Sequence, residues 1–384
     1  MTEKLYDADA YLTAFSAEVL ACWEDNKRYR VILDQTAFFP EQGGQYADTG
    51  TLGDAKVLDV QISDGEITHF CDRYLPPHTK VVGMLDWDKR YDRMQNHSGE
   101  HLISGLIHTR YGYDNVGFHL GDEDMTLDIN GVLTREQLLE IELAANEAVW
   151  KNLPVLIEFP DAETLASLSY RSKLELTENV RIVTFPEYDV CACCAPHVHA
   201  TGEIGMIKIL EAIHYKGGMR VHVRCGRRAL ADYNVRNENV VSIANALHVK
   251  TEESASAVAR LMAQLDKQKS EIHTLQRELL ALKTAELSYT DGNLCFIEEG
   301  ADIAALRSMV NAGMEKCGGV CAAFSGNDKD GYLFVLGAKN VPLRARAKEI
   351  TSALSGRGGG TDQMISGSVS ACAEVIRSYI EKFC

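Results

Sequence analysis

The chain has 384 residues, of which 46% are hydrophobic and 24% charged, and its formal net charge is −16. These values are ordinary for a globular protein with two or three domain cores, and they exclude a disordered or fibrous chain. No window reaches the roughly 18 consecutive apolar residues that a membrane span needs, and the N-terminus lacks the pattern of a secretory signal. We therefore expect a cytoplasmic protein.

Eleven cysteines, an odd and unevenly spread count, do not fit a secreted disulfide framework and leave thiols free for metal binding or packing. The negative charge argues against non-specific coating of nucleic acid, because that affinity comes largely from Lys and Arg. One local basic surface remains compatible with this charge, although short basic runs are more often solvated faces. The candidate positions are Lys89, Arg90, Arg93, Lys216, Arg220, Arg224, Arg227 and Arg228.

The first half of the chain predicts two domains of different kinds. Residues 1–90 contain short apolar runs separated by turn residues such as Asp64-Gly65, which predicts a small β-barrel. From Tyr91 to about Gly112 the spacing changes to three and four residues, which predicts a helix. A strand pair, a helix over 134–151 and further alternation predict an α+β domain over 91–227 with a mainly antiparallel sheet.

The second half predicts a helical arm and a terminal domain. Residues 228–287 contain neither Pro nor Gly and carry an apolar seam, which predicts one long helix with coiled-coil character. This helix would either pack on its own domain or form an arm between domains or molecules. Residues 288–384 alternate strands and helices around a glycine loop, which predicts a second compact α/β domain. The seam consists of Val258, Leu261, Leu265, Ile272, Leu275, Leu279 and Leu282.

The strongest local motif is NHSGEHL at 96–102. His97 and His101 are four residues apart on the expected helix, so both rings project from one face with room for a cation between them. Gly99 lies between them, although glycine in a helix costs about 1 kcal/mol relative to alanine. Close approach of another segment to this backbone would explain that residue.

The segment CACCAPHVHATGEIG at 191–205 supplies the other half of a metal site. Cys193 and His197 have a Cys-x3-His spacing, and one thiolate with three imidazoles selects zinc over magnesium. Cys191, Cys194 and His199 are rival ligands in the same stretch. Four protein ligands normally mark a closed structural site, so a zinc ion without a catalytic role is the alternative.

The sequence HSGEH also fits the H-x-x-E-H pattern of inverted zinc peptidases. In that interpretation Glu100 would be the general base, and Glu175 or Glu178 would supply a carboxylate ligand. The pattern is short and has two free positions. It also leaves the Cys193 and His197 pair and the C-terminal domain unexplained.

Three segments resemble, in order and separation, the editing domain of alanyl-tRNA synthetases and the free-standing AlaX editing proteins. They are TAFFPEQGGQYADTG at 36–50, DWDKRYDRMQNHSGEHL at 86–102 and CCAPHVHATGEIG at 193–205. LSGRGGGTDQMISGSV at 354–369 resembles the glycine-rich signature of the DHH-associated domain that ends those synthetases and the long AlaX form. The chain departs from the family at Phe39 and Gln42 in the first motif and at Cys194, Ala195 and Pro196 in the third.

The resemblance implies an ester hydrolase that acts in trans on tRNA(Ala) charged with serine, or alternatively glycine. A pocket that accepts alanine cannot strongly reject these two amino acids, so a second site must remove them. The implied zinc ligands are His97, His101, Cys193 and His197. The alternative to this enzyme is a tRNA-binding protein that has no catalytic activity and in which the zinc ion has only a structural role.

The resemblance also suggests roles for the other site residues. Thr36 would contact the serine hydroxyl. Gln45, with the backbone of Gly43 and Gly44, would lie near the terminal adenosine or the oxyanion, or would form only a structural turn. Glu100 is a candidate base, although a solvated helix carboxylate is the plainer interpretation.

Contact with the rest of the tRNA is expected from two places. Arg220 is the basic candidate for substrate binding. The backbone N–H groups of Gly358, Gly359 and Gly360 could meet phosphate. The terminal domain of the synthetases also contributes to self-association, so the resemblance implies a homodimer through the helical arm or the C-terminal domain.

Overall fold

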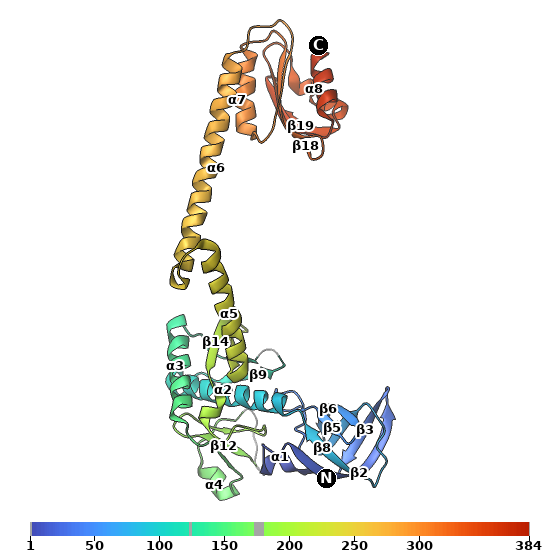
Figure 1. The fold of residues 1–384 in the computed structure, drawn as a ribbon, viewed down its shortest axis with the longest axis vertical. Coiled ribbons are helices and arrows are strands. Elements are labelled where there is room, and N and C mark those ends of the chain that lie inside the picture. The colour runs from blue at the N-terminus through green and yellow to red at the C-terminus, as the bar shows by residue number, and fades with distance from the viewer. Residues whose placement is uncertain (1, 123–124, 173–179, 384) are drawn as a thin grey trace. The chain divides into compact units, whose positions relative to one another are not determined.

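A computed structural model describes residues 2–122, 125–172 and 180–383 (Figure 1). The candidate peptidase ligands Glu175 and Glu178 lie outside these residues. The chain divides into two compact units, Met1–Ser242 and Ile243–Cys384. The finer division at residues 90, 227 and 287 stays a prediction. No helix among the described residues is long and apolar enough to cross a membrane.

The N-terminal unit begins with a closed six-stranded barrel, which confirms the predicted one. Its strands alternate buried and exposed positions, as in β7, because successive side chains point to opposite faces. In barrel order they are β2 (Ala14–Asp25), β3 (Arg28–Leu33), β7 (Glu66–Cys71), β6 (Ala55–Ser63), β5 (Gly50–Leu52) and β8 (Lys80–Leu85). Beside the barrel, α1 (Leu5–Ala8) follows β1 (Glu3–Lys4), which pairs in parallel with β4 (Gln35–Thr36).

The helix α2 (Trp87–Tyr111) runs through the unit's second core. It begins before the expected Tyr91 because the Asp86 side chain caps it, accepting from the Lys89 N–H at 3.4 Å. Close approach at Gly99 is confirmed, because a Cβ there would lie 2.3 Å from the Cys225 sulfur. The NHSGEHL motif is therefore buried among strands rather than exposed on a surface helix.

Antiparallel sheets pack around α2, which confirms a mixed α+β architecture. One sheet has the order β14 (Ile207–Tyr215), β15 (Gly218–Cys225), β10 (Met125–Ile129) and β9 (Asn115–Leu120). The other has the order β11 (Leu156–Glu158), β12 (Ile182–Phe185) and β13 (Asp189–Ala192). The remaining helices are α3 (Arg135–Lys151), α4 (Ala162–Ser167) and the short 3-10 helix Thr201–Ile204.

The prediction of one long helix over 228–287 is wrong. The segment forms α5 (Gly226–Leu247), a 3-10 turn (Thr251–Glu253) and α6 (Ser254–Ala285). His248 takes a left-handed conformation (φ 53°), its N–H donates to the Asn245 carbonyl, and the Val249 N–H donates to the Ala244 carbonyl. This bonding pattern ends a helix without glycine or proline, so their absence did not guarantee continuity.

The C-terminal unit contains a five-stranded sheet in the order β16 (Leu294–Glu298), β17 (Val320–Asn327), β18 (Gly331–Ala338), β20 (Met364–Val369) and β19 (Gly356–Gly360). Besides α6, its helices include α7 (Ile303–Met314), α8 (Leu343–Ala353) and α9 (Ala373–Glu381). The glycine run is therefore an edge strand and not the expected loop. A Cβ at Gly356 or Gly358 would lie 2.1 or 2.6 Å from backbone oxygens of β20, so glycine permits this pairing.

Candidate metal centre

Four side chains from two distant segments meet in the N-terminal unit. The ligand atoms of His97, His101, Cys193 and His197 all lie within 4.8 Å of one another. The Cys193 sulfur is 3.3 Å from His197 Nε2 and 3.6 Å from His97 Nε2. The two α2 histidine rings are nearly parallel, with centroids 5.5 Å apart, as their four-residue spacing requires. We refer to these four residues as the cluster.

The rival ligands lie elsewhere or form a different group. The His199 ring stacks on Tyr11, with centroids 3.9 Å apart. The Cys194 sulfur faces Gly43, 3.6 Å from the position that a Cβ there would take. Cys191 groups with His101 and Asp189. The structure thus brings the Cys193 and His197 pair, rather than its rivals, to both α2 histidines.

Each histidine of the cluster is oriented through its Nδ1 atom. Nδ1 of His97 lies 2.8 Å from the Gln45 side-chain oxygen, and Nδ1 of His101 lies 2.8 Å from Asp189 Oδ2. Because an amide oxygen and a carboxylate only accept, both rings donate from Nδ1 and direct Nε2 toward the cluster. His197 Nδ1 lies 2.9 Å from Ser98 Oγ.

The electrostatics of the cluster favour a thiolate among imidazoles. Burial opposes ionisation of Cys193, but His97 and His197 nearby lower the pKa of this thiol well below its usual range. Burial lowers the pKa of His197 to about 3, so that ring is neutral and its nitrogen is available as a ligand. Burial also disfavours a charged His101, but the hydrogen bond to Asp189 raises the pKa of this ring well above its usual value.

The cluster fits a zinc ion. His101 Nε2 is buried without a hydrogen-bond partner among the described residues, and a bound cation would satisfy it. One thiolate and three imidazole nitrogens are a donor set that tetrahedral zinc accepts. A possible metal-binding group is therefore present, as the two sequence motifs predicted.

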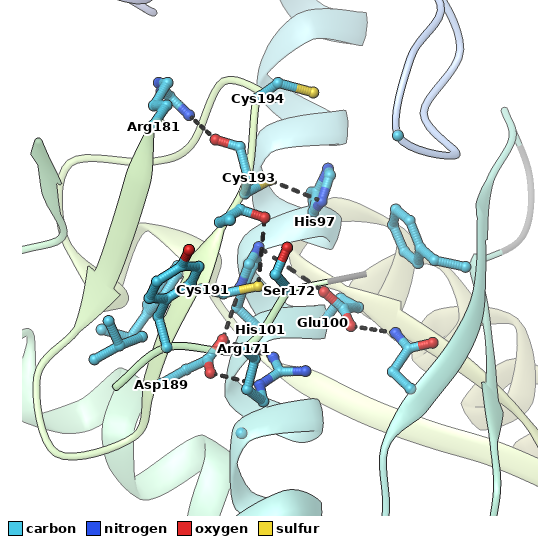
Figure 2. Close-up of a pocket in the computed structure, with 18 of the residues that line it drawn as sticks. His97, Glu100, His101, Arg171, Ser172, Arg181, Asp189, Cys191, Cys193 and Cys194 are labelled. Carbon is cyan, nitrogen blue, oxygen red and sulfur yellow. Dashed lines mark hydrogen bonds and ion pairs between the residues drawn. The ribbon is translucent and has the colours of Figure 1, made fainter. Parts of the chain in front are cut away.

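A cavity of about 1090 Å³ opens over the cluster (Figure 2). It is large enough for a small-molecule-sized ligand. Figure 2 shows side chains from α2 and from the β13 segment facing each other across it. Its lining includes His97, Glu100, His101, Asn115, Phe118, Tyr170, Arg171, Arg181, Asp189, Cys191 and Cys193.

Glu100 lines this cavity and is not the solvated carboxylate that seemed the plainer interpretation. Its residue is only 5% exposed, and Ser104 Oγ and Asn115 Nδ2 both donate to its Oε1. Its Oε2 lies 4.0 Å from His101 Nε2. Glu100 thus places a carboxylate, fixed by two hydrogen bonds, next to the candidate metal site.

The first glycine motif approaches the cluster through Gln45. Gly43 and Gly44 have φ values of 63° and 84°, which glycine adopts without strain. A Cβ at Gly44 would lie 2.4 Å from the Phe118 carbonyl oxygen. Gly43 lines the cavity, whereas Gln45 is fully buried behind His97. The turn therefore delivers the side chain that orients a cluster histidine.

Thr36 lies in the barrel core, fully buried and absent from the residues that line the cavity. Its hydroxyl donates to His69 Nε2 at 2.8 Å and accepts from the Phe38 N–H at 3.1 Å. Burial lowers the pKa of His69 to about 4, so its ring is neutral. Nδ1 of His69 donates to the Val31 carbonyl at 3.2 Å, which leaves Nε2 to accept from Thr36.

The arginines among the basic candidates are buried or paired with carboxylates. Arg90 and Arg93 are buried and bind Asp48 and backbone carbonyls, so their placement on a surface was wrong. Arg220 forms two hydrogen bonds with Asp128, stacks over Tyr215 and does not line the cavity. Arg224, Arg227 and Arg228 pair with Asp232, Asp88 and Asp92.

The remaining predicted residues lie in the other unit. Gly358, Gly359 and Gly360 occupy the exposed edge strand β19. The sequence analysis missed Ser98, His69, Asp189 and Arg171. Ser98 lies inside the first motif and Asp189 two residues before the second, but nothing in the spacing marks them as partners of histidines.

The chain is similar to known domains of tRNA synthetases and to an editing protein. The family described as "Threonyl and Alanyl tRNA synthetase second additional domain" matches residues 180–224, and "tRNA synthetases class II (A)" matches residues 6–89. The alanyl-tRNA editing protein AlaX-L of Pyrococcus horikoshii is 28% identical, over 98% of this chain and 96% of that protein. The resemblance to the AlaX editing proteins is confirmed.

Alanine–tRNA ligases match as well, but over part of their length. The ligase of Pyrococcus abyssi is 29% identical over 99% of this chain and 43% of the ligase. That of Halorubrum lacusprofundi is 32% identical over 94% of this chain and 40% of the ligase. The solved C-Ala domain of the Aquifex aeolicus alanyl-tRNA synthetase matches 25% of this chain and 94% of its own, at 20% identity and a TM-score of 0.21. A score this low supports no conclusion about the fold.

Proposed function

We propose that this protein is a zinc-dependent aminoacyl-tRNA deacylase that hydrolyses the ester of tRNA(Ala) carrying serine, with glycine as the alternative substrate. The observation that carries the proposal is the cavity in which the cluster and the Glu100 carboxylate lie side by side. The similarity to AlaX-L over nearly the whole of both chains supports the choice of substrate class.

In this proposal His97, His101, Cys193 and His197 hold the zinc ion. A zinc ion can polarise an ester carbonyl or lower the pKa of water. Glu100 accepts the proton of the attacking water, because its carboxylate is held by Ser104 and Asn115 at the cavity wall. Gln45 keeps His97 in the ligating tautomer, and the turn at Gly43 and Gly44, of which Gly43 lines the cavity, offers backbone groups to the aminoacyl end.

Thr36 stays the residue that we propose to recognise serine, although its side chain is fully buried in the barrel core and does not line the cavity. The Thr36 hydroxyl donates its proton to His69. Toward the serine hydroxyl, the Thr36 oxygen would therefore act as a hydrogen-bond acceptor. A site built to hydrogen-bond a hydroxyl discriminates strongly against substrates that lack it.

A second candidate function follows from the cluster itself. Four protein ligands are typical of structural zinc sites. In this alternative the zinc ion only stabilises the fold of a tRNA-binding protein that has no catalytic activity. The peptidase alternative depends on Glu175 or Glu178, which lie outside the described residues.

The deciding experiment compares release of serine, glycine and alanine from charged tRNA(Ala) by the zinc-loaded protein. We expect serine or glycine to be released at least about 100-fold faster than alanine, because editing must spare the correct product. Equal release of alanine would contradict editing. Tight tRNA binding without release of any amino acid would favour the structural alternative.

Contacts with the body of the tRNA are proposed for Arg220 and for the backbone of Gly358, Gly359 and Gly360. A homodimer is proposed through the exposed seam of α6, whose leucines and isoleucine are 41–65% exposed. Sedimentation of the protein with and without tRNA tests both proposals. A Leu275→Lys and Leu279→Lys variant that still sediments as the wild type would exclude the seam as the interface.

A further inference from the structure

Arg171 forms a two-pronged ion pair behind the candidate metal site. Its Nε lies 2.7 Å from Asp189 Oδ1, and its Nη2 lies 2.7 Å from Asp189 Oδ2. The backbone is attached at the same place, because the Arg171 N–H donates to the Val190 carbonyl and the Ala192 N–H donates to the Arg171 carbonyl. Figure 2 shows Arg171 and Asp189 together on the wall beside His101.

Asp189 Oδ2 is shared between Arg171 and His101. It accepts from Nδ1 of His101 at 2.8 Å, so the arginine, the carboxylate and the imidazole form a continuous chain that ends at the cluster. The Asp189 side chain is only 2% exposed. A buried carboxylate without its cationic partner is costly, and rotation of its plane would turn the ring that it holds.

The other two cluster histidines are held differently. Gln45 supplies a neutral amide to His97, and Ser98 supplies a hydroxyl to His197. His101 is the histidine of the cluster whose partner is a carboxylate. Two parallel N–H···O bonds from Arg171 fix the orientation of that carboxylate and balance its negative charge. The same carboxylate is also a candidate ligand with Cys191, but both of its oxygens are occupied by Arg171.

We infer that Arg171 is a positioning residue of the metal site, which acts through Asp189 to fix the orientation of His101. This inference rests on the proposed zinc site but not on the proposed substrate. Arg171 keeps the Asp189 carboxylate in its accepting geometry, and it ties the cavity wall at residues 169–172 to the ligand. Loss of such an outer partner typically weakens metal binding 10- to 100-fold.

The test measures zinc affinity by competition with a chelator, together with the visible absorption spectrum of the cobalt-substituted protein. We expect Arg171→Met to weaken zinc binding about 10- to 100-fold and to shift the cobalt bands, and Arg171→Lys to restore part of the affinity. Arg228→Met is the matched control, because it removes a half-buried Arg–Asp pair with no contact to the cluster. Its zinc affinity and cobalt spectrum should equal those of the wild type.

Combination with Asp189→Asn separates a positioning role from general destabilisation. If Arg171 acts through Asp189, the double variant loses no more zinc affinity than Asp189→Asn alone. Additive losses, or wild-type affinity in Arg171→Met, would overturn the inference. Wild-type protein that holds no zinc would overturn it together with the zinc site, whereas normal zinc binding without deacylation would contradict only the proposed function.

Discussion

The cluster and the Thr36–His69 pair are two buried, histidine-centred groups in the same unit, but their polar atoms are used in opposite ways. In the cluster each Nδ1 atom is occupied by a partner and His101 Nε2 is left without one, beside a cavity. In the pair, both ring nitrogens of His69 and the Thr36 proton have partners inside the barrel. A buried nitrogen without a hydrogen-bond partner thus distinguishes the candidate metal site from a polar core group whose atoms all have partners.

Removal of the thiolate should give the largest effect. Cys193→Ala should lower zinc affinity by more than about 100-fold, since loss of a ligand exceeds loss of an outer partner, and should abolish deacylation. Metal analysis after dialysis and the deacylation assay measure both. Cys194→Ala is the matched control for metal content, because the Cys194 sulfur faces Gly43 outside the cluster. Equal zinc loss in both variants would contradict the assignment of Cys193, rather than Cys194, as the ligand.

Glu100→Gln should separate metal binding from chemistry. We expect about a 100-fold decrease in kcat with KM and zinc content nearly unchanged, because an amide cannot accept the proton of water. Ser104→Ala removes one of the donors to Glu100 and should decrease kcat less. Full activity of Glu100→Gln would exclude this carboxylate as the base.

Thr36→Val should show whether the Thr36–His69 pair has only a structural role in the barrel core. Loss of the hydroxyl leaves His69 Nε2 without a donor and should cost about 1–3 kcal/mol of stability. If Thr36 also recognises serine, seryl-tRNA deacylation should decrease about tenfold more than glycyl-tRNA deacylation, which a side-by-side kinetic assay measures. An equal decrease for both substrates would assign Thr36 to the barrel core alone.

The contribution of His69 should be visible only in acid. Its folded pKa of about 4 lies below the usual value near 6.5, so the unfolded chain binds the proton more readily. Its contribution to stability is complete above pH 6.5 and is lost as the pH falls toward 4, by up to about 3 kcal/mol. Denaturant unfolding between pH 7.5 and 4.5 should therefore show a flatter pH dependence for His69→Asn than for the wild type. Parallel curves would mean that His69 is not neutral in the folded protein.

The sequence by itself predicted the barrel, the mixed α+β domain and the two histidines that α2 brings to the cluster, whereas the family resemblance was needed to prefer Cys193 and His197 over their rivals. Alternating apolar positions predicted the barrel, and four-residue spacing placed His97 and His101 on one helix face. Both are local properties that the period of the backbone sets. Gly99 even indicated that a segment would pack closely on that helix, and Cys225 of β15 does so.

Only the tertiary structure decided which groups surround these side chains. Gln45, Ser98 and Asp189 reach the cluster from three different segments, and no local period marks them. Burial decided that Arg90 and Arg93 are core residues and that Glu100 lies in a cavity rather than in solvent. The break between α5 and α6 depends on a left-handed His248, a conformation that composition does not reveal. Side-chain spacing thus predicts ligands, whereas the partners that orient them follow from long-range packing.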